Sequence, residues 1–550
     1  MSAAPSAPSE EAPSTPEALD PAPPPDSPPP GHVTAKKAGR GGAAVAAAKV
    51  YFILVGLVQQ IALKRVLGLE AYGALSSALQ AASIAYNPLV QTSIQGVSRV
   101  VASAKDDERP RALRRALSAH AVVALVAGAL FFVFAEPLGR WMGAPHIVLS
   151  LQLLSAVMVA YGLYAPLVGA LNGFHRFLAQ AGLDALAATL RTVGLIGGAV
   201  WFAHRAAAVA GGASGSTSGL LGRLGGAEGA ILGFVVAATL ILLVSVFLVG
   251  VGKPGGTRPS FRQHFSFLFP LLLGQALLNC LFQADALLLR RFASEAATTA
   301  GMDVTAADAL VGAYRAAQLF CFLPYQLLMS ITFVLFPMVA QAAAASDRTA
   351  VRRYVRNGIR LAAMVTGLLV SVVSGLSYGL IDLVFGADAA QLGGGAARIL
   401  ALGLGFLAIF GIQTAVLNSL GYERASAWVT GLAFVLVVTA CFVGVRGQEF
   451  GEILLVRTAW ATAAGLTIAT CAAGWAVRRT AGGVIALSSA LRIGGALALT
   501  TVVGVALPAG GKLLTLVYAP VLASVYVTCL VLTRELGSAD LAQLKAVIRR

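Results

Sequence analysis

The sequence has few charged residues for its length. Only 12% of its 550 residues are Asp, Glu, Lys or Arg, whereas 57% are hydrophobic, and the mean hydropathy is +0.80. Soluble domains carry about 25% charged residues, which cover their surfaces. The composition therefore excludes an ordinary soluble protein and predicts an all-α polytopic membrane protein.

Cysteine is scarce as well, and catalytic motifs are missing. The five cysteines are odd in number, lack CxxC spacing and lie in apolar stretches, which excludes a disulfide framework and a zinc site. The six histidines form no HExxH motif, and the stretch Gly250 to Pro254 lacks the spacing of a phosphate-binding loop. We therefore expect a protein that is not an enzyme and that binds neither a cofactor nor a metal.

Positive charge is plentiful, with a net charge of +16 and a pI near 10. Nucleic-acid binders gather Lys and Arg on one face. Here the basic residues stand singly or in small clusters between long apolar runs. This distribution is typical of membrane topology and argues against a nucleic-acid partner.

The apolar runs are long enough to cross a hydrocarbon core of about 30 Å at 1.5 Å per residue. We predict about 14 transmembrane helices, at residues 44–63, 72–101, 116–136, 147–170, 178–203, 230–252, 265–289, 309–338, 359–384, 397–418, 426–445, 455–476, 486–507 and 513–533.

The basic residues also orient the chain. Lys36, Lys37, Arg40 and Lys49 precede the first span, and most of the 40 Lys and Arg residues fall in segments that would then be cytoplasmic. An even number of crossings predicts that both termini are cytoplasmic, in a multi-pass protein of the inner (plasma) membrane.

Two segments differ in composition from the spans. Residues 1–42 are rich in Pro, Ala and Ser and lack aromatic residues, which predicts a disordered cytoplasmic tail. Residues 211–229 are rich in Gly and Ser and predict a flexible external loop.

An internal repeat divides the membrane part. The stretch Leu138 to Gly143 is similar to Ile381 to Gly386, and Leu171 to Gly173 is similar to Leu417 to Ser419, in both cases about 245 residues later. We therefore predict a parallel repeat of two six-helix lobes, at 43–252 and 253–484, followed by a helix pair and a cytoplasmic tail at 485–550. Parallel repeats with a site between the lobes are a transporter architecture.

Ionisable residues inside the spans are candidates for function because each costs roughly 2.5–3.5 kcal/mol to insert. Arg191 and Arg315 lie well within spans, and Arg99 lies nearer a span end. We expect Arg191 and Arg315, with Arg99 and Arg291, to line a cationic cavity that binds phosphate or diphosphate. The alternatives are snorkelling, pairing between helices and, for Arg291 and its neighbour Arg290, anchoring at the membrane interface.

The span at 265–289 is unusually polar. Gln275, Asn279 and Gln283 are spaced i, i+4, i+8 and predict a polar stripe that faces a cavity or another helix. Asp285 follows as a coupling or charge partner, or as a member of an internal salt bridge. Asp184 shares a helical face with Arg191, but at about 10 Å along the axis it is too distant for a direct pair.

Several short motifs, in order along the chain, resemble the polysaccharide-repeat-unit (lipid-linked oligosaccharide) flippases of the multidrug/oligosaccharidyl-lipid/polysaccharide exporter superfamily. The motifs are Arg65 to Gly73, Asp285 with Leu288 and Leu289, Val311 to Tyr314, Leu335 to Pro337, Phe385 to Gly386, and Leu417 to Gly421.

The resemblance implies two six-helix bundles around a V-shaped cationic cavity that faces the two sides of the membrane in turn. It implies export of a polyprenyl-diphosphate-linked oligosaccharide, with polysaccharide polymerase and glycosyltransferases as partners. Alternatives are a peptidoglycan lipid-precursor flippase, a multidrug or small-molecule antiporter and, from another class, a membrane glycosyltransferase or polymerase. An excess of intramembrane Arg over Asp argues against organic-cation export, and the lack of a large external loop argues against the enzymes.

Overall fold

The computed structural model describes residues 35–105, 107–210, 225–255, 261–508 and 511–537. Its elements are α1 (Ala35–Ser103), α2 (Arg109–Trp141), the short 3-10 helix η1 (Pro145–Ile147), α3 (Val148–Gly173), α4 (Phe177–Ala210), α5 (Gly226–Val249), α6 (Phe261–Thr299), α7 (Ala306–Cys321), α8 (Leu323–Ala344), α9 (Arg348–Gly375), α10 (Ser377–Phe385), α11 (Ala387–Ser419), α12 (Glu423–Gly444), α13 (Glu452–Ala481), α14 (Leu487–Ala506) and α15 (Lys512–Leu532). These described segments contain helices and no strands.

Within the described residues, twelve helices are long and apolar enough to cross a membrane. One of them, α1, contains two of the predicted spans, because the backbone leaves the helical region at Gly68, where φ is 78°. Another predicted span, 309–338, is divided into α7 and α8 at Phe322. Counted this way the helices reproduce the predicted 14 spans, and the all-α polytopic fold is confirmed.

Two predicted segments lie wholly or partly outside the described residues. Residues 1–34 of the predicted tail and residues 211–224 of the predicted Gly/Ser loop are among them. Residues 35–42 are helical, because α1 begins at Ala35, and residues 226–229 belong to α5.

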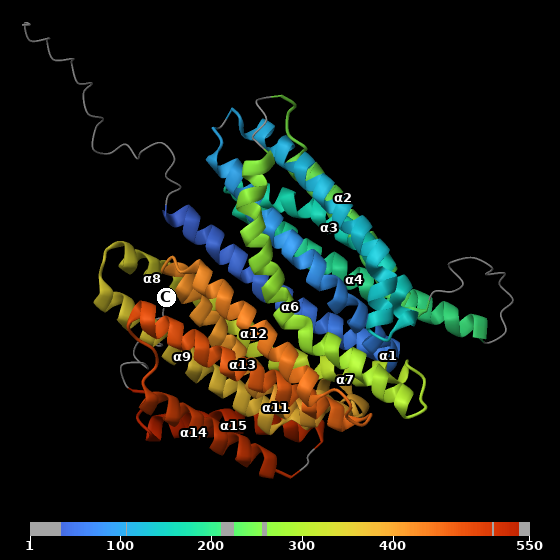
Figure 1. Cartoon of the computed structure of the whole chain (residues 1–550), viewed down its shortest axis with the longest axis vertical. Helices are drawn as coiled ribbons and strands as arrows, with labels where there is room; N and C mark the ends of the chain where they lie inside the picture. Colours follow the sequence, from blue (N-terminus) through green and yellow to red (C-terminus); the bar gives the residue numbers. More distant parts are fainter. Residues whose placement is uncertain (1–34, 106, 211–224, 256–260, 509–510, 538–550) are drawn as a thin grey trace, which may run out of the picture.

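The helices form two lobes (Figure 1). Helix α3 is central to one lobe and packs against α1, α2 and α5, whereas α11 is central to the other and packs against α7, α8, α9, α10 and α13. Helices α1 and α6 run between the lobes. A glycine with positive φ precedes each central helix: Gly143 before α3 and Gly386 before α11. The two glycines therefore occupy corresponding positions in the two lobes, as the predicted repeat implies. The domain boundaries given above remain predictions.

Close approach of helices depends on small residues. Gly194 and Gly198 of α4 face Gly229 and Gly233 of α5, and a Cβ on any of the four would overlap atoms of the facing helix. Interfaces rich in small residues are the usual way for helices to pack in lipid, where no hydrophobic force drives them together. The spacing of these glycines therefore fixes the α4–α5 pair.

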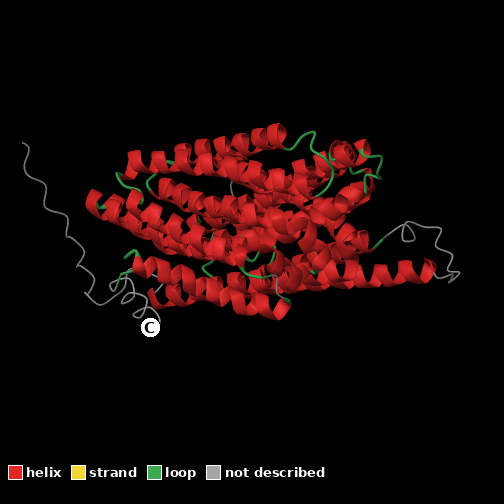
Figure 2. Ribbon diagram, turned by 90° about the horizontal axis from the view of Figure 1, so that it is seen from below, coloured by secondary structure: helices red, strands yellow, loops and turns green. Residues whose placement is uncertain are grey.

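Helices α14 and α15 lie outside the two lobes, against α9 (Figure 1). Figure 2 shows the described residues from below, as helices joined by loops and turns. The turn after α15 returns to the first half of α9, where Glu535 pairs with Arg360 at 2.7 Å. Helix α1 begins at this same end of the bundle (Figure 1). We call it the terminal end, and we call the end with Gly68 and the start of α7 the far end.

Candidate functional site

The first predicted site residue, Arg191, lies on α4 and is half-buried. Its guanidinium carbon is 5.0 Å from the centroid of the Phe234 ring on α5, a cation–π arrangement. Its Nε is buried and makes no hydrogen bond to any described residue. In the part of the chain that the structure describes, no ion pair joins Arg191 to a carboxylate. The charge is therefore held by the ring face and remains available to an anion.

Arg315 lies on α7, in the other half of the repeat, and comes within electrostatic range of Arg191. The phenols of Tyr72 and Tyr86 on α1 are also within that range of Arg315, and Tyr161 on α3 is within range of Arg191. The rings of Tyr86 and Tyr161 have centroids 6.3 Å apart. The structure thus brings the two predicted arginines together among tyrosine side chains.

Asp285 is 3% exposed on α6 and is held by neutral donors. It accepts hydrogen bonds from Tyr314 Oη at 2.7 Å, from Gln318 Nε2 at 3.3 Å and from the Ala286 backbone at 2.8 Å, and Thr462 Oγ1 is 3.5 Å away. Gln318 also accepts from Arg315 Nη1 at 3.2 Å. Gln318 therefore links the Asp285 carboxylate to the Arg315 guanidinium.

The predicted polar stripe on α6 meets α1. Asn87 Nδ2 donates to Asn279 Oδ1 at 3.1 Å, and Asn279 Nδ2 donates to the backbone oxygen of Gln275, one turn earlier. Gln283 is half-buried, and its buried Oε1 accepts no hydrogen bond from the described residues. The stripe thus serves in part to join α6 to α1 through their side-chain amides.

The remaining predicted residues lie apart from this pair. Arg99 is exposed near the end of α1, and Asp184 lies within electrostatic range of Tyr164. Arg291 contacts Glu295 at 3.0 Å, donates to the Trp141 backbone oxygen at 3.0 Å and lies 5.4 Å from the Trp141 ring. These contacts tie Arg291 to the far end of the bundle and use its donors there.

A buried ion pair of the second half, which was not predicted from the sequence, contacts the first half at the far end. Arg290 is 0% exposed, and its Nε lies 3.2 Å from Asp308 Oδ1, while His146 Nε2 lies 2.8 Å from Asp308 Oδ2. Arg290 also donates to Ser294, whose hydroxyl donates to the Gly143 backbone oxygen at 3.0 Å. Since His146 and Gly143 follow α2 whereas Arg290 and Asp308 belong to α6 and α7, these contacts hold the two halves together.

Two further contacts reinforce the far end. Lys64 Nζ of α1 lies 2.7 Å from Asp388 Oδ1 of α11. Beside it, α1 and α7 cross at glycines: a Cβ on Gly73 would overlap the backbone oxygen of Asp308, and a Cβ on Gly312 would overlap that of Leu69. We call this reciprocal contact the glycine crossing. It admits no side chain larger than hydrogen.

The glycine crossing predicts a specific loss of lobe contact. In Gly73→Val, we expect the two lobes to stay apart at the far end, because the new side chain would overlap α7. Cysteines introduced at Lys64 and Asp388 and joined by a short bifunctional thiol reagent should cross-link at least fivefold more slowly than in the wild-type background. Gly56→Val on the same helix, where a Cβ would meet nothing within 4 Å, is the control. Equal cross-linking in both variants would contradict the prediction.

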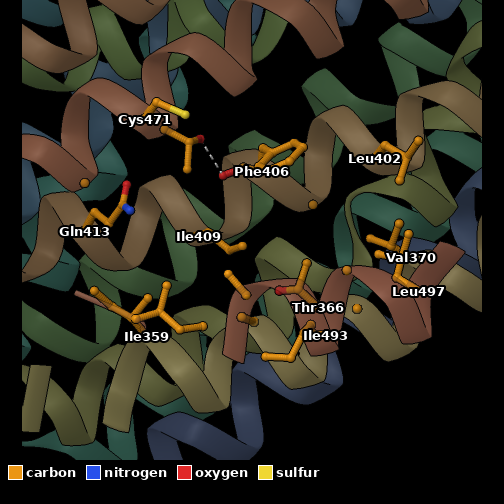
Figure 3. A pocket seen from close by; sticks show the side chains of 18 residues that line it. Ile359, Thr366, Val370, Leu402, Phe406, Ile409, Gln413, Cys471, Ile493 and Leu497 are labelled. Atoms are coloured by element: carbon orange, nitrogen blue, oxygen red, sulfur yellow. Dashed lines mark hydrogen bonds between the residues drawn. The ribbon is translucent and has the colours of Figure 1, made fainter. Parts of the chain in front are cut away.

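A separate apolar cavity of about 450 Å³ lies between α9, α11, α13 and α14 (Figure 3). Ile359, Val370, Phe406, Ile493 and Leu497 are among its lining residues. Few polar groups reach it, Gln413 and Thr470 among them. The cavity can therefore hold a hydrocarbon chain but offers little to a charged or sugar group.

Solved structures with the same fold are transport proteins. The chain is similar to "Lipid II flippase MurJ, inward closed conformation", with a TM-score of 0.70, 13% identity and coverage of 89% of this chain and 99% of that one. It is also similar to an inward-facing multidrug resistance MATE family transporter of the MOP superfamily, with a TM-score of 0.59, 15% identity and coverage of 80% and 98%. A MOP superfamily transporter from Pyrococcus furiosus matches with a TM-score of 0.54, 16% identity and coverage of 80% and 95%.

Sequence comparison adds the family. A search of curated proteins finds no match. The model of the family described as "Polysaccharide biosynthesis protein" matches residues 38–343. That segment is more than half of the chain; it runs from α1 into α8 and contains both Arg191 and Arg315. The chain therefore belongs to the polysaccharide biosynthesis protein family.

Proposed function

We propose that the protein is a flippase, which moves a polyprenyl-diphosphate-linked oligosaccharide from the cytoplasmic to the outer leaflet of the inner membrane. The two lobes alternate in access around the Arg191–Arg315 pair. The protein catalyses no covalent step; polysaccharide polymerase and glycosyltransferases act before and after it. Family membership and the fold of the solved transporters support this proposal.

One observation carries the proposal: Arg191 and Arg315, from the two halves of the repeat, lie within electrostatic range of each other. Two like charges within this range repel each other, and the repulsion grows as the local dielectric constant falls. A diphosphate between the two guanidiniums would convert the repulsion into charge-assisted hydrogen bonds. Tyr72, Tyr86 and Tyr161 would supply hydroxyl groups beside it.

In this proposal Asp285 sets the position of Arg315. The carboxylate orients Gln318, and Gln318 accepts from Arg315. Thr462 of α13 reaches the same carboxylate, so the position of Arg315 depends on how α6, α7 and α13 pack. Asp285 is thus the proposed coupling partner, through which a rearrangement of the second lobe reaches the substrate site.

The far-end contacts are consistent with an inward-facing state. The lobes are joined there by the His146–Asp308–Arg290 group, by Lys64 with Asp388 and by the glycine crossing. We propose, from the distribution of basic residues, that the terminal end is cytoplasmic. The contacts at the far end would then close the route to the outside.

The membrane potential can supply the driving force. A lipid diphosphate carries about two negative charges, and each gains about 2.3 kcal/mol per 100 mV on moving outward across an inside-negative membrane. The arginine pair would lower the cost of removing water from the diphosphate. An exporter of organic cations would need the opposite charge at this place.

The proposal is tested in proteoliposomes loaded with a fluorescent polyprenyl-diphosphate oligosaccharide. Outward movement is measured as label that becomes accessible to an added membrane-impermeant quencher. We expect accessibility to rise faster with an inside-negative potential than with the potential reversed. A rate equal to that of empty liposomes, together with efflux of organic cations, would refute the flippase and favour the multidrug antiporter. A peptidoglycan lipid precursor as a second cargo distinguishes selection of the glycan from recognition of the shared diphosphate.

A further inference from the structure

A second cationic site lies outside the lobe interface, at the terminal end of the second lobe. A pocket of about 480 Å³ is formed where α9 and α14 begin and α15 ends. Six arginines line it: Arg352, Arg353, Arg356, Arg360, Arg492 and Arg534. We call it the arginine pocket.

Its positive charge is only partly compensated. Glu535 is 2% exposed and is the only carboxylate among the described lining residues; Arg360 Nε lies 2.7 Å and Arg492 Nη1 3.4 Å from its oxygens. Burial alone would raise the pKa of Glu535, but hydrogen bonds from Arg360, Ser489 and Arg492 outweigh burial and hold the pKa below its usual range. An ionised Glu535 therefore neutralises one arginine among six.

Two features of the arginine pocket are locally unfavourable. Arg352, Arg356 and Arg360 are spaced i, i+4, i+8 along α9, and like charges at this spacing repel each other. Arg534 has φ of 55°, in the left-handed region, at the end of α15, where glycine is the usual residue. Both features would be offset by an anion that fills the pocket.

The apolar cavity lies next to the arginine pocket along the same two helices, where neighbouring residues line one or the other. On α9, Arg356 and Arg360 line the pocket, and Ile359 and Ala363 line the cavity. On α14, Arg492 lines the pocket and Ile493 lines the cavity, whose side chains are drawn in Figure 3. A phosphate site at a helix end, beside a cavity for hydrocarbon, has the two halves of a lipid site.

The surface around the two cavities is suited to lipid. On α14 the large apolar side chains of Leu487, Leu491 and Val502 are 75%, 67% and 64% exposed. Helices α14 and α15 lie at the outer edge of the molecule (Figure 1), away from the α1–α7 crossing. A ligand can therefore enter sideways from the bilayer without passing between the lobes.

We propose that the arginine pocket binds the phosphate headgroup of an anionic phospholipid of the bilayer, with one acyl chain in the apolar cavity. The bound lipid fastens α14, and the turn after α15, to α9. The site is distinct from the Arg191–Arg315 pair, so its occupant is a resident lipid and not the transported molecule.

The experiment measures retention of lipid by the purified full-length protein in nanodiscs of phosphatidylcholine with added phosphatidylglycerol, by native mass spectrometry. We expect wild-type protein to retain phosphatidylglycerol in preference to phosphatidylcholine. Removing one arginine should lower that preference about fivefold, and Arg352→Gln with Arg356→Gln together about 25-fold. Arg424→Gln, at an exposed site on α12, is the matched control and should retain it fully.

A second variant separates binding from folding. Arg534→Gly places the favoured residue at the left-handed position, so it should keep or raise the midpoint of thermal unfolding while it lowers retention of phosphatidylglycerol. Equal retention by wild type and by both sets of variants would overturn the proposal. Two competition results would also overturn it: displacement of the lipid by millimolar inorganic diphosphate, which indicates a site for free phosphate, and stoichiometric displacement by polyprenyl diphosphate, which indicates an entry site for the cargo.

Discussion

Charge reversal at Arg191 or Arg315 is expected to abolish translocation by a protein that still inserts and folds. A glutamate at either position would repel the negatively charged diphosphate. The remaining arginine would then lose its contact with the anion. Losing one charge-assisted contact and adding a repulsive one should cost several kcal/mol at the substrate, or more than a hundredfold in rate. The reversed side chain also pairs with the remaining arginine and thereby occupies the site.

The measurement is outward movement of the labelled lipid in proteoliposomes of matched protein content. Arg446→Glu makes the same change at an exposed position outside the pair and should transport at the wild-type rate. The double variant Arg191→Glu with Arg315→Glu tests whether the two charges must be positive. It again has like charges at both positions, but they are negative, so it should be as inactive as either single variant. Normal export by both single variants would remove the pair from the substrate site.

Asp308→Asn is expected to separate the lobes at the far end. The substitution keeps the shape of the side chain but leaves Arg290, which is 0% exposed, without a counter-charge. Removing one partner of a buried ion pair costs about 3–5 kcal/mol. Asp308 contacts His146 of the first half, and Arg290 donates to Ser294, which donates to Gly143 of the first half. The cost therefore falls on the joined state, whose population should drop by at least a hundredfold relative to the separated one.

A cysteine at Ala144, which is 0% exposed, reports on this change. We expect it to react with a membrane-impermeant thiol reagent at least tenfold faster in Asp308→Asn than in the wild-type background. Asp303→Asn removes an exposed carboxylate from the preceding loop and is the control. Replacing both partners, with Arg290→Met and Asp308→Leu, should restore slow reaction, because no unpaired charge remains. Equal reactivity in all four proteins would mean that the ion pair does not hold the far end closed.

The spans and the repeat could be predicted because they depend on properties of contiguous sequence. Hydropathy located each crossing, and Gly143 and Gly386 marked the same point in both lobes. The break at Gly68 falls between the predicted spans 44–63 and 72–101, but hydropathy did not predict that the two spans would continue as one helix interrupted only at that glycine. Arg191 and Arg315 could be identified because an arginine inside an apolar run is conspicuous wherever the helix packs.

The partners of charged groups could not be predicted, because they come from distant parts of the chain. Asp285 was considered for an internal salt bridge; in the structure Tyr314, Gln318 and Thr462 hold it through neutral hydrogen bonds. Arg290 was interpreted as an interfacial anchor, yet it is fully buried against Asp308. Which ends of helices meet is decided by tertiary packing, and helical spacing carries no information about it.

The glycine crossing has a consequence for ancestry. Leu69 and Gly73 stand to each other as Asp308 and Gly312 do, and each glycine lies against the backbone oxygen of the other pair. Such a mutual arrangement, in which residue i meets j while j meets i, is the signature of an isologous dimer interface. The two lobes meet as identical subunits would, around a pseudo-two-fold axis, so a six-helix ancestor could dimerise through this contact before its gene was duplicated and fused.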